Sequence, residues 1–170
     1  WRAPDAMRRE LELLSGAVLN TLRILAPLNP ADRYYAELLA LPRQGYFMET
    51  YNVILWAGLK HKPKRILEIG TRHGGSIVQL LTAYDRHDDL QVTCFDIWRD
   101  GGGPDAVRRN LQLLSIATDP IEFISGDSKE TVPAWKAAHP DAQLDYVLVD
   151  GGHDVETAAI DLRNVVDLVA

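Results

Sequence analysis

Four short apolar runs alternate with amphipathic stretches in the second part of this chain, and this alternation constrains the fold more than any other feature. The runs occupy residues 65–69, 91–95, 121–124 and 144–149. The stretches between them repeat apolar residues every three or four positions, which is typical of helices that cover a sheet. Alternating strands and helices predict a parallel sheet with helices on both faces, and right-handed crossovers make it doubly wound. We therefore expect an α/β fold with four parallel strands.

The first sixty residues are expected to be helical throughout. Apolar residues between Pro4 and Pro27 fall on one helical face, and further helices are expected over about residues 31–41 and 47–59. We therefore divide the chain into a helical segment, residues 1–60, and a cofactor-binding part, residues 61–170. The helical segment would pack against the sheet, cover a substrate pocket as a lid, or form a homo-oligomer contact, and these three alternatives stay open.

Composition argues against two classes of partner. The chain has 24 Asp and Glu against 18 Lys and Arg, a net charge of −6, so a nucleic-acid-binding face is not expected. No uncharged apolar stretch reaches the roughly 18 residues of a membrane span, and the N-terminus is charged. The single cysteine, Cys94, cannot form an internal disulfide. We expect a cytoplasmic protein without a membrane or nucleic-acid partner.

A carboxylate stands at or near the end of each apolar run, and these residues are Glu68, Asp96, Asp127 and Asp150. Ligands of such sheets bind beyond the carboxyl ends of the strands, so the four positions are expected to meet at one site. Glu68 enters a loop in which Gly70 and Gly74 permit a tight turn and a close approach of ligand to backbone. A carboxylate there would repel a diphosphate but attract an ammonium or a sulfonium. The alternative is that Glu68 only accepts hydrogen bonds from amides of the loop.

Asp96 and Asp127 have signals that are less specific. Asp96 lies about 20 residues beyond the glycine loop, the spacing at which an acidic residue binds the ribose hydroxyls of a nucleotide, and NAD enzymes share this spacing. Asp127 either accepts a hydrogen bond from an adenine amino group or caps the helix that Ser128 begins. Neither residue by itself therefore distinguishes between the nucleotide cofactors.

Taken in order, these motifs resemble motifs I to IV of class I S-adenosylmethionine-dependent methyltransferases. The residues that carry the resemblance are Glu68, Gly70, Gly74-Gly75-Ser76, Asp96, Gly126-Asp127-Ser128 and Val149-Asp150-Gly151-Gly152-His153. The first and last motifs are similar to those of the small-molecule O-methyltransferases grouped with macrocin O-methyltransferase and the cephalosporin-hydroxylase-like proteins of antibiotic biosynthesis. The resemblance covers about residues 64–170 and implies a Rossmann-like fold. A complete sheet of that family has seven strands, so we expect the natural protein to be longer than this chain.

The resemblance implies a role for each matching position. Gly70 and Gly74 would pass close to the methionine part of S-adenosylmethionine, with Glu68 near its ammonium. Asp96 would hold the ribose hydroxyls and Asp127 would face the adenine. The remaining residues of the expected cofactor site are Thr71, Ser76, Trp98, Ser128 and Asp150. Trp98 would cover the nucleoside, and the alternative is that its ring packs onto the sheet edge.

Asp150 and His153 are the positions at which the resemblance implies chemistry. In metal-dependent relatives the matching Asp ligates Mg²⁺ and the His is a candidate base. An imidazole near neutral pKa can take the proton from an acceptor hydroxyl, and a divalent ion would lower the pKa of that hydroxyl. A lone carboxylate does not make a magnesium site, and the other alternative is a simple turn in which Asp154 caps the next helix.

The function expected from these residues is O-methylation of a small hydroxylated acceptor, a sugar or a natural product, with S-adenosylmethionine as methyl donor. Two alternatives stay open. One is a nicotinamide-dependent oxidoreductase, which would place a diphosphate beside Glu68. The other is a non-catalytic cofactor-binding module of a larger protein, since a fold does not determine function.

Overall fold

The computed structural model describes residues 5–28, 46–87, 89–99 and 102–169. The chain forms two compact units, and each is described by itself. The first unit combines residues 1–62 with residues 75–85, and the second combines residues 63–74 with residues 86–170. The helical unit thus includes a segment, residues 75–85, that the sequence-based boundary at residue 60 assigns to the cofactor-binding part.

The first unit is helical in its described residues. It contains α1 (Asp5–Leu25) with the short 3₁₀ helix η1 (Ala26–Leu28), α3 (Tyr46–His61) and α4 (Gly75–Leu81). The helices predicted between Pro4 and Pro27 and over about residues 47–59 are confirmed by α1 and α3. The helix expected over residues 31–41 lies outside the described residues. The buried side chains of the unit include Val18, Leu22, Leu25, Ile54, Leu55, Ile77, Leu80 and Leu81.

Polar contacts also join α1 to α3. The Asn52 side-chain amide donates to Ser15 Oγ at 2.8 Å, and Trp56 Nε1 donates to Glu10 Oε2 at 2.8 Å. By length and composition alone, residues 9–28 would suffice to cross a bilayer, a test that the core helix of a soluble protein also passes. Because α1 has buried apolar residues and hydrogen bonds to α3, its apolar face already has a partner within the unit.

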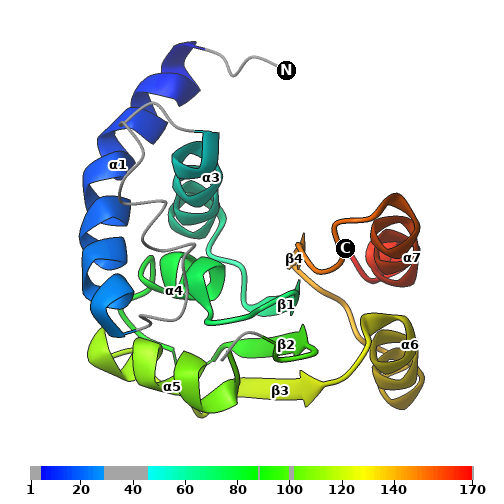
Figure 1. Cartoon of the computed structure of the whole chain (residues 1–170). Coiled ribbons are helices and arrows are strands. Elements are labelled where there is room, and N and C mark those ends of the chain that lie inside the picture. Colours follow the sequence, from blue (N-terminus) through cyan, green and yellow to red (C-terminus); the bar gives the residue numbers. More distant parts are fainter. Residues whose placement is uncertain (1–4, 29–45, 88, 100–101, 170) are drawn as a thin grey trace. The chain divides into compact units, whose positions relative to one another are not determined.

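The second unit is built on a four-stranded parallel sheet (Figure 1). Its strands are β1 (Arg65–Ile69), β2 (Gln91–Asp96), β3 (Ile121–Ser125) and β4 (Tyr146–Val149), in the spatial order β3-β2-β1-β4. All four predicted strands are confirmed. The chain moves outward from β1 to β3 and then returns to the other side of β1, so the topological switch point lies between β1 and β4.

Helices cover both faces of this sheet, as the doubly wound topology predicts. On one face, α6 (Ser128–Ala138) and α7 (Val155–Val165) enclose an apolar core with the strands. The core consists of Leu67, Ile69, Phe95, Val132, Leu144, Val165 and Leu168, the last from the 3₁₀ helix η2 (Val166–Leu168). On the other face lies α5 (Pro104–Leu113), whose Arg108 guanidinium is 4.7 Å from the centre of the Phe123 ring on β3. This arrangement leaves the carboxyl ends of the strands as the place for a site.

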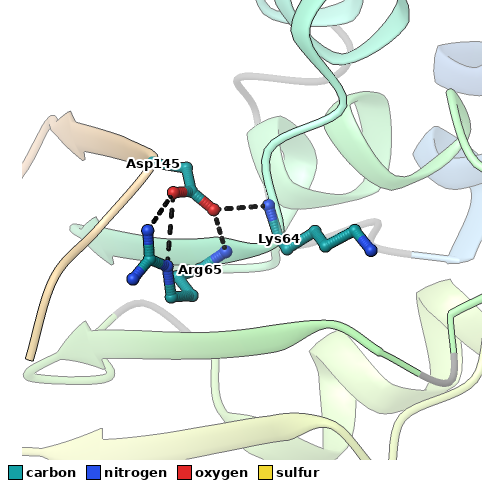
Figure 2. A network of polar contacts seen from close by, with 3 residues as sticks. All are labelled: Lys64, Arg65 and Asp145. Atoms are coloured by element: carbon teal, nitrogen blue, oxygen red, sulfur yellow. Dashed lines mark hydrogen bonds and ion pairs between the residues drawn. The ribbon is translucent and has the colours of Figure 1, made fainter. Parts of the chain in front are cut away.

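Asp145 joins the amino ends of β1 and β4, as Figure 2 shows. Its Oδ2 accepts from the backbone N–H groups of Lys64 and Arg65 at 3.0 Å each, and its Oδ1 accepts from Arg65 Nε at 3.2 Å and Nη2 at 2.5 Å. The hydrogen bonds from the guanidinium and the two amides lower the pKa of Asp145 to about 2. The same contacts explain why β4 begins at Tyr146 rather than at Leu144, which instead forms an isolated parallel bridge with Val169.

We expect Asp145→Asn to lower stability by about 1 kcal/mol at neutral pH, a modest value because the ion pair is partly exposed. The carboxylate stabilises the fold fully above its unfolded-state pKa of about 4. This contribution is lost as the pH falls through the folded-state pKa of about 2. Urea unfolding between pH 7 and pH 2 should therefore show a shallower loss of stability for the variant than for the unsubstituted protein. The exposed Asp141→Asn is the control, and parallel curves for Asp145→Asn would contradict the expectation.

Candidate functional site

The loops at the carboxyl ends of the four strands interlock through backbone hydrogen bonds. Gly70 N–H, at the end of β1, donates to the Phe95 carbonyl of β2 at 2.8 Å. Asp150 N–H, at the end of β4, donates to the Ile69 carbonyl at 2.8 Å, and Gly126 N–H, after β3, donates to the Asp96 carbonyl at 3.0 Å. The sheet thus brings the four predicted loop positions to one end, as parallel strands require.

Both glycines of the loop after β1 (residues 70–74, the glycine loop) are required by their surroundings. Gly70 has φ +94°, and a Cβ there would overlap the backbone carbonyl of Asp150. Gly74 has φ +79°, and a Cβ there would lie 2.7 Å from Val107 Cγ1 on α5. A side chain at either position would therefore meet both backbone strain and a steric clash. The loop has this sequence because it packs tightly between β4 and α5.

Asp96 is held at the end of β2 by two backbone amides. Its Oδ2 accepts from Arg72 N–H of the glycine loop at 2.8 Å, and its Oδ1 accepts from Trp98 N–H at 2.5 Å. Arg72 and Trp98 both have φ +53°, a conformation that residues with a side chain rarely adopt. Each carboxylate oxygen retains a second acceptor position. Asp96 is therefore oriented by the protein and still able to accept hydrogen bonds from a ligand.

Trp98 packs onto the edge strand β3. Its Nε1 donates to Ser125 Oγ at 2.7 Å, and its ring centre is 6.2 Å from that of Phe123. Packing onto the sheet edge was one of the two roles expected for this residue. Trp98 is the second residue after Asp96, and a contact of its ring with a nucleoside stays a prediction.

Asp127 is the N-cap of α6. Its side chain accepts from Lys129 N–H at 3.0 Å, and its Oδ2 is 3.6 Å from Lys129 Nζ. The side chain of Ser128 contacts Asp161, a fully buried residue of α7 whose pKa is raised by burial. The capping role is thus present in the structure, and an adenine contact of the exposed Asp127 carboxylate stays a prediction.

Asp150 and His153 form a pair in the turn after β4. His153 Nε2 lies 3.6 Å from Asp150 Oδ1, and the two side chains are 84% and 66% exposed. Loss of hydration raises the pKa of Asp150, and the nearby imidazole acts in the opposite direction. Asp154 caps α7 by accepting from Thr157 N–H at 2.8 Å, as the turn interpretation expects. Because Asp154 makes the cap, Asp150 and His153 take no part in it, and both side chains face solvent.

Glu68 differs from the other carboxylates because it is fully buried. It is the register partner of Cys94 on β2 and shares a sheet face with Tyr146 of β4. Burial, with a contribution from the Glu68 charge, raises the pKa of Tyr146 to about 12 and that of the Cys94 thiol well above its usual range. Glu68 is therefore buried within the sheet, and its contact with a cofactor ammonium stays a prediction.

The other predicted residues occupy different surroundings. Thr71 is nearly fully buried and its N–H donates weakly to the Phe95 carbonyl at 3.4 Å. Ser76 lies in α4, which belongs to the helical unit. Among the described residues, no group of three or more His, Cys, Asp or Glu side chains is placed to hold a metal ion. In the part of the chain that the structure describes, Asp150 therefore has no neighbouring side chains that would complete a magnesium site with it.

Asn110 on α5 is a residue of the site that the sequence reasoning missed. It is fully buried, and its Nδ2 donates to the His73 carbonyl of the glycine loop at 2.9 Å. A signal was present, because Asn110 follows Val107 by three residues and precedes Leu111, so that a polar side chain lies on the apolar face of an amphipathic helix. Most buried polar side chains have a hydrogen-bond partner, so such a residue points to a contact inside the fold.

The comparisons with known proteins agree with this geometry. A family model described as a methyltransferase domain matches residues 67–170. No curated protein sequence matches the chain. Among solved structures, CalS11, a TDP-rhamnose 3'-O-methyltransferase of calicheamicin biosynthesis, is 20% identical with a TM-score of 0.58, and the match covers 89% of this chain and 72% of that one.

Two further structures were determined with a cofactor or its product bound. PaMTH1 of Podospora anserina, bound to S-adenosylhomocysteine, is 15% identical with a TM-score of 0.61, and the match covers 99% of this chain and 66% of that one. TomG of Streptomyces achromogenes, in complex with S-adenosylmethionine, is 22% identical with a TM-score of 0.59, and the match covers 86% and 60%. This chain thus spans between 60% and 72% of the three structures.

The structural likenesses show that these proteins share the fold. The family model covers β1 from Leu67 onward, the other three strands, the glycine loop and all the carboxyl-end loops described above. The chain therefore belongs to the class I S-adenosylmethionine-dependent methyltransferase family.

Proposed function

We propose that this chain is the cofactor-binding part of a cytoplasmic O-methyltransferase that transfers the methyl group of S-adenosylmethionine to a small hydroxylated molecule. The observation that carries the proposal is the Asp96 carboxylate, held between the amides of Arg72 and Trp98 at the end of β2. The activity of CalS11 on TDP-rhamnose and the role of TomG in tomaymycin synthesis support a sugar or another natural product as the acceptor.

The carboxylates at the ends of the strands suit a cationic nucleoside. Asp96 would accept from the two ribose hydroxyls, since each of its oxygens has one acceptor position left after the amide is bound. Asp127 would accept from the adenine amino group while it continues to cap α6. A diphosphate would instead meet carboxylates at these loops and be repelled by them. The residues present therefore fit S-adenosylmethionine better than a nicotinamide dinucleotide.

The Asp150–His153 pair supplies the chemistry that the protein itself would contribute. When bound, S-adenosylmethionine supplies an electrophilic methyl group on a sulfonium. His153 would take the proton from the acceptor hydroxyl as the oxygen attacks, and Asp150 would orient the imidazole and stabilise its charged form. The glycine loop and Asp96 would hold the reacting groups in line. Mg²⁺ does not fit the described residues on their own, so no step of this proposal depends on a metal.

We expect the chain to bind S-adenosylhomocysteine and not NAD in calorimetric titrations. Asp96→Asn should weaken S-adenosylhomocysteine binding by about tenfold to a hundredfold, because it replaces charged hydrogen bonds to the ribose with neutral ones and weakens the contact with Arg72. Asp145→Asn is the matched control, since it removes a hydrogen-bonded carboxylate at the opposite end of the sheet. Binding of NAD, or equal affinity in Asp96→Asn, would contradict the assigned cofactor.

We expect His153→Ala in the natural full-length protein to lower turnover by about 10²- to 10⁴-fold while the affinity for S-adenosylhomocysteine is kept, since general-base catalysis contributes about that much. Methyl transfer from labelled S-adenosylmethionine to a panel of sugars and phenols measures the effect. His139→Ala, at the far end of α6, is the control. Unchanged turnover in His153→Ala would remove the base from the proposal. Binding without transfer by the unsubstituted protein would favour a non-catalytic module.

A further inference from the structure

We propose that α5 is a clamp that holds the glycine loop in its ligand-binding conformation, and that Asn110 is the positioning residue of this clamp. The proposal rests on the proposed function only for the identity of the ligand. The clamp itself is a property of the free protein. Through this clamp α5 would take part in cofactor binding, although none of its residues is expected to touch the cofactor.

Three consecutive contacts join α5 to the loop. At its start, Gly103 N–H donates to the Arg72 carbonyl at 3.4 Å. One turn later, Val107 occupies the space beside Gly74, where a Cβ would lie 2.7 Å from Val107 Cγ1. Almost a turn beyond, Asn110 Nδ2 donates to the His73 carbonyl at 2.9 Å. Gly103 is the N-cap residue just before α5, and the spacing of three residues places the Val107 and Asn110 side chains on one face of the helix.

The hydrogen bond from Asn110 is the polar anchor of this face. Asn110 is fully buried and reaches across 37 positions of sequence to the loop. Without this donor the His73 carbonyl would lose a buried hydrogen bond, and the loss of such a bond shifts an equilibrium by about tenfold. Gly103 N–H and the Val107 side chain cannot replace it, because they contact the neighbouring residues on either side of His73.

The residue next to His73 explains why the loop needs a clamp. Arg72 has φ +53°, a conformation that costs free energy for a residue with a side chain. Its N–H is also the donor to Asp96 Oδ2. Asn110 and Asp96 therefore hold adjacent residues of the loop from two sides. If the His73 carbonyl is released, Arg72 can relax to a more common conformation, and Asp96 loses the amide that orients it toward the ribose.

Hydrogen exchange of the free protein tests the clamp without any ligand. In Asn110→Ala and in the nearly isosteric Asn110→Asp, which has no N–H donor, the amides of residues 71–74 should exchange about tenfold faster than in the unsubstituted protein. Leu168→Ala is the control, because it removes a buried side chain of the same unit at the amino end of β4, near Leu144. It should lower stability without a selective increase in loop exchange.

Affinity for S-adenosylhomocysteine gives a second readout. Both Asn110 variants should bind it about tenfold more weakly, and Leu168→Ala should bind it as the unsubstituted protein does at a temperature where both are folded. Faster loop exchange in a protein that binds no S-adenosylhomocysteine would support the clamp and contradict the proposed function. Unchanged loop exchange in either Asn110 variant would overturn the clamp.

A measurement on the unsubstituted protein decides the case if neither variant folds. The carboxamide protons of Asn110 should exchange slowly with solvent in the nuclear magnetic resonance spectrum, because the group is fully buried and donates to His73. Rapid exchange of these protons, at the rate of an exposed asparagine side chain, would overturn the proposal.

Discussion

The arrangement of the site depends on the absence of a side chain at Gly70. The backbone carbonyl of Asp150 occupies the space that a Cβ would take, so the ends of β1 and β4 lie in direct backbone contact at the switch point of the sheet. This contact also sets the direction in which the chain leaves β1, and therefore where the following residues meet Asp96. The glycine loop, the Asp96 carboxylate and the Asp150–His153 pair are thus linked through one close approach of two backbones.

The strands could be predicted because each is a short apolar run between amphipathic stretches, and α1 and α3 could be predicted from the period of their apolar residues. The residue at which β4 begins could not be predicted. Leu144 has the composition of a strand residue, but Asp145 turns its carboxylate to the amides of Lys64 and Arg65. The grouping of α4 with the helical unit is also absent from the local pattern, because it depends on tertiary contacts.

The site could be predicted in position but not in its internal contacts. Residues that follow parallel strands lie at the same end of the sheet, so the placement of Asp96, Asp127 and Asp150 at that end followed from topology alone. Asp96 is held by the amides of Arg72 and Trp98, and both residues have a positive φ. Neither residue type indicates this conformation in the sequence, so these contacts could not be predicted. Asn110 could be placed on the apolar face of α5 from the sequence, but its partner could not, because the His73 carbonyl lies 37 residues away and is reached only through tertiary packing.

The burial of Cys94 has a practical consequence. It is the only cysteine of the chain, and its thiol lies fully buried in a strand beside the negative charge of Glu68, which keeps it in the protonated, unreactive form. A cysteine introduced at an exposed position would consequently be the sole target of a maleimide or iodoacetamide reagent. Fluorophores or spin labels can then be attached at chosen points on the native background, without first removing a natural thiol.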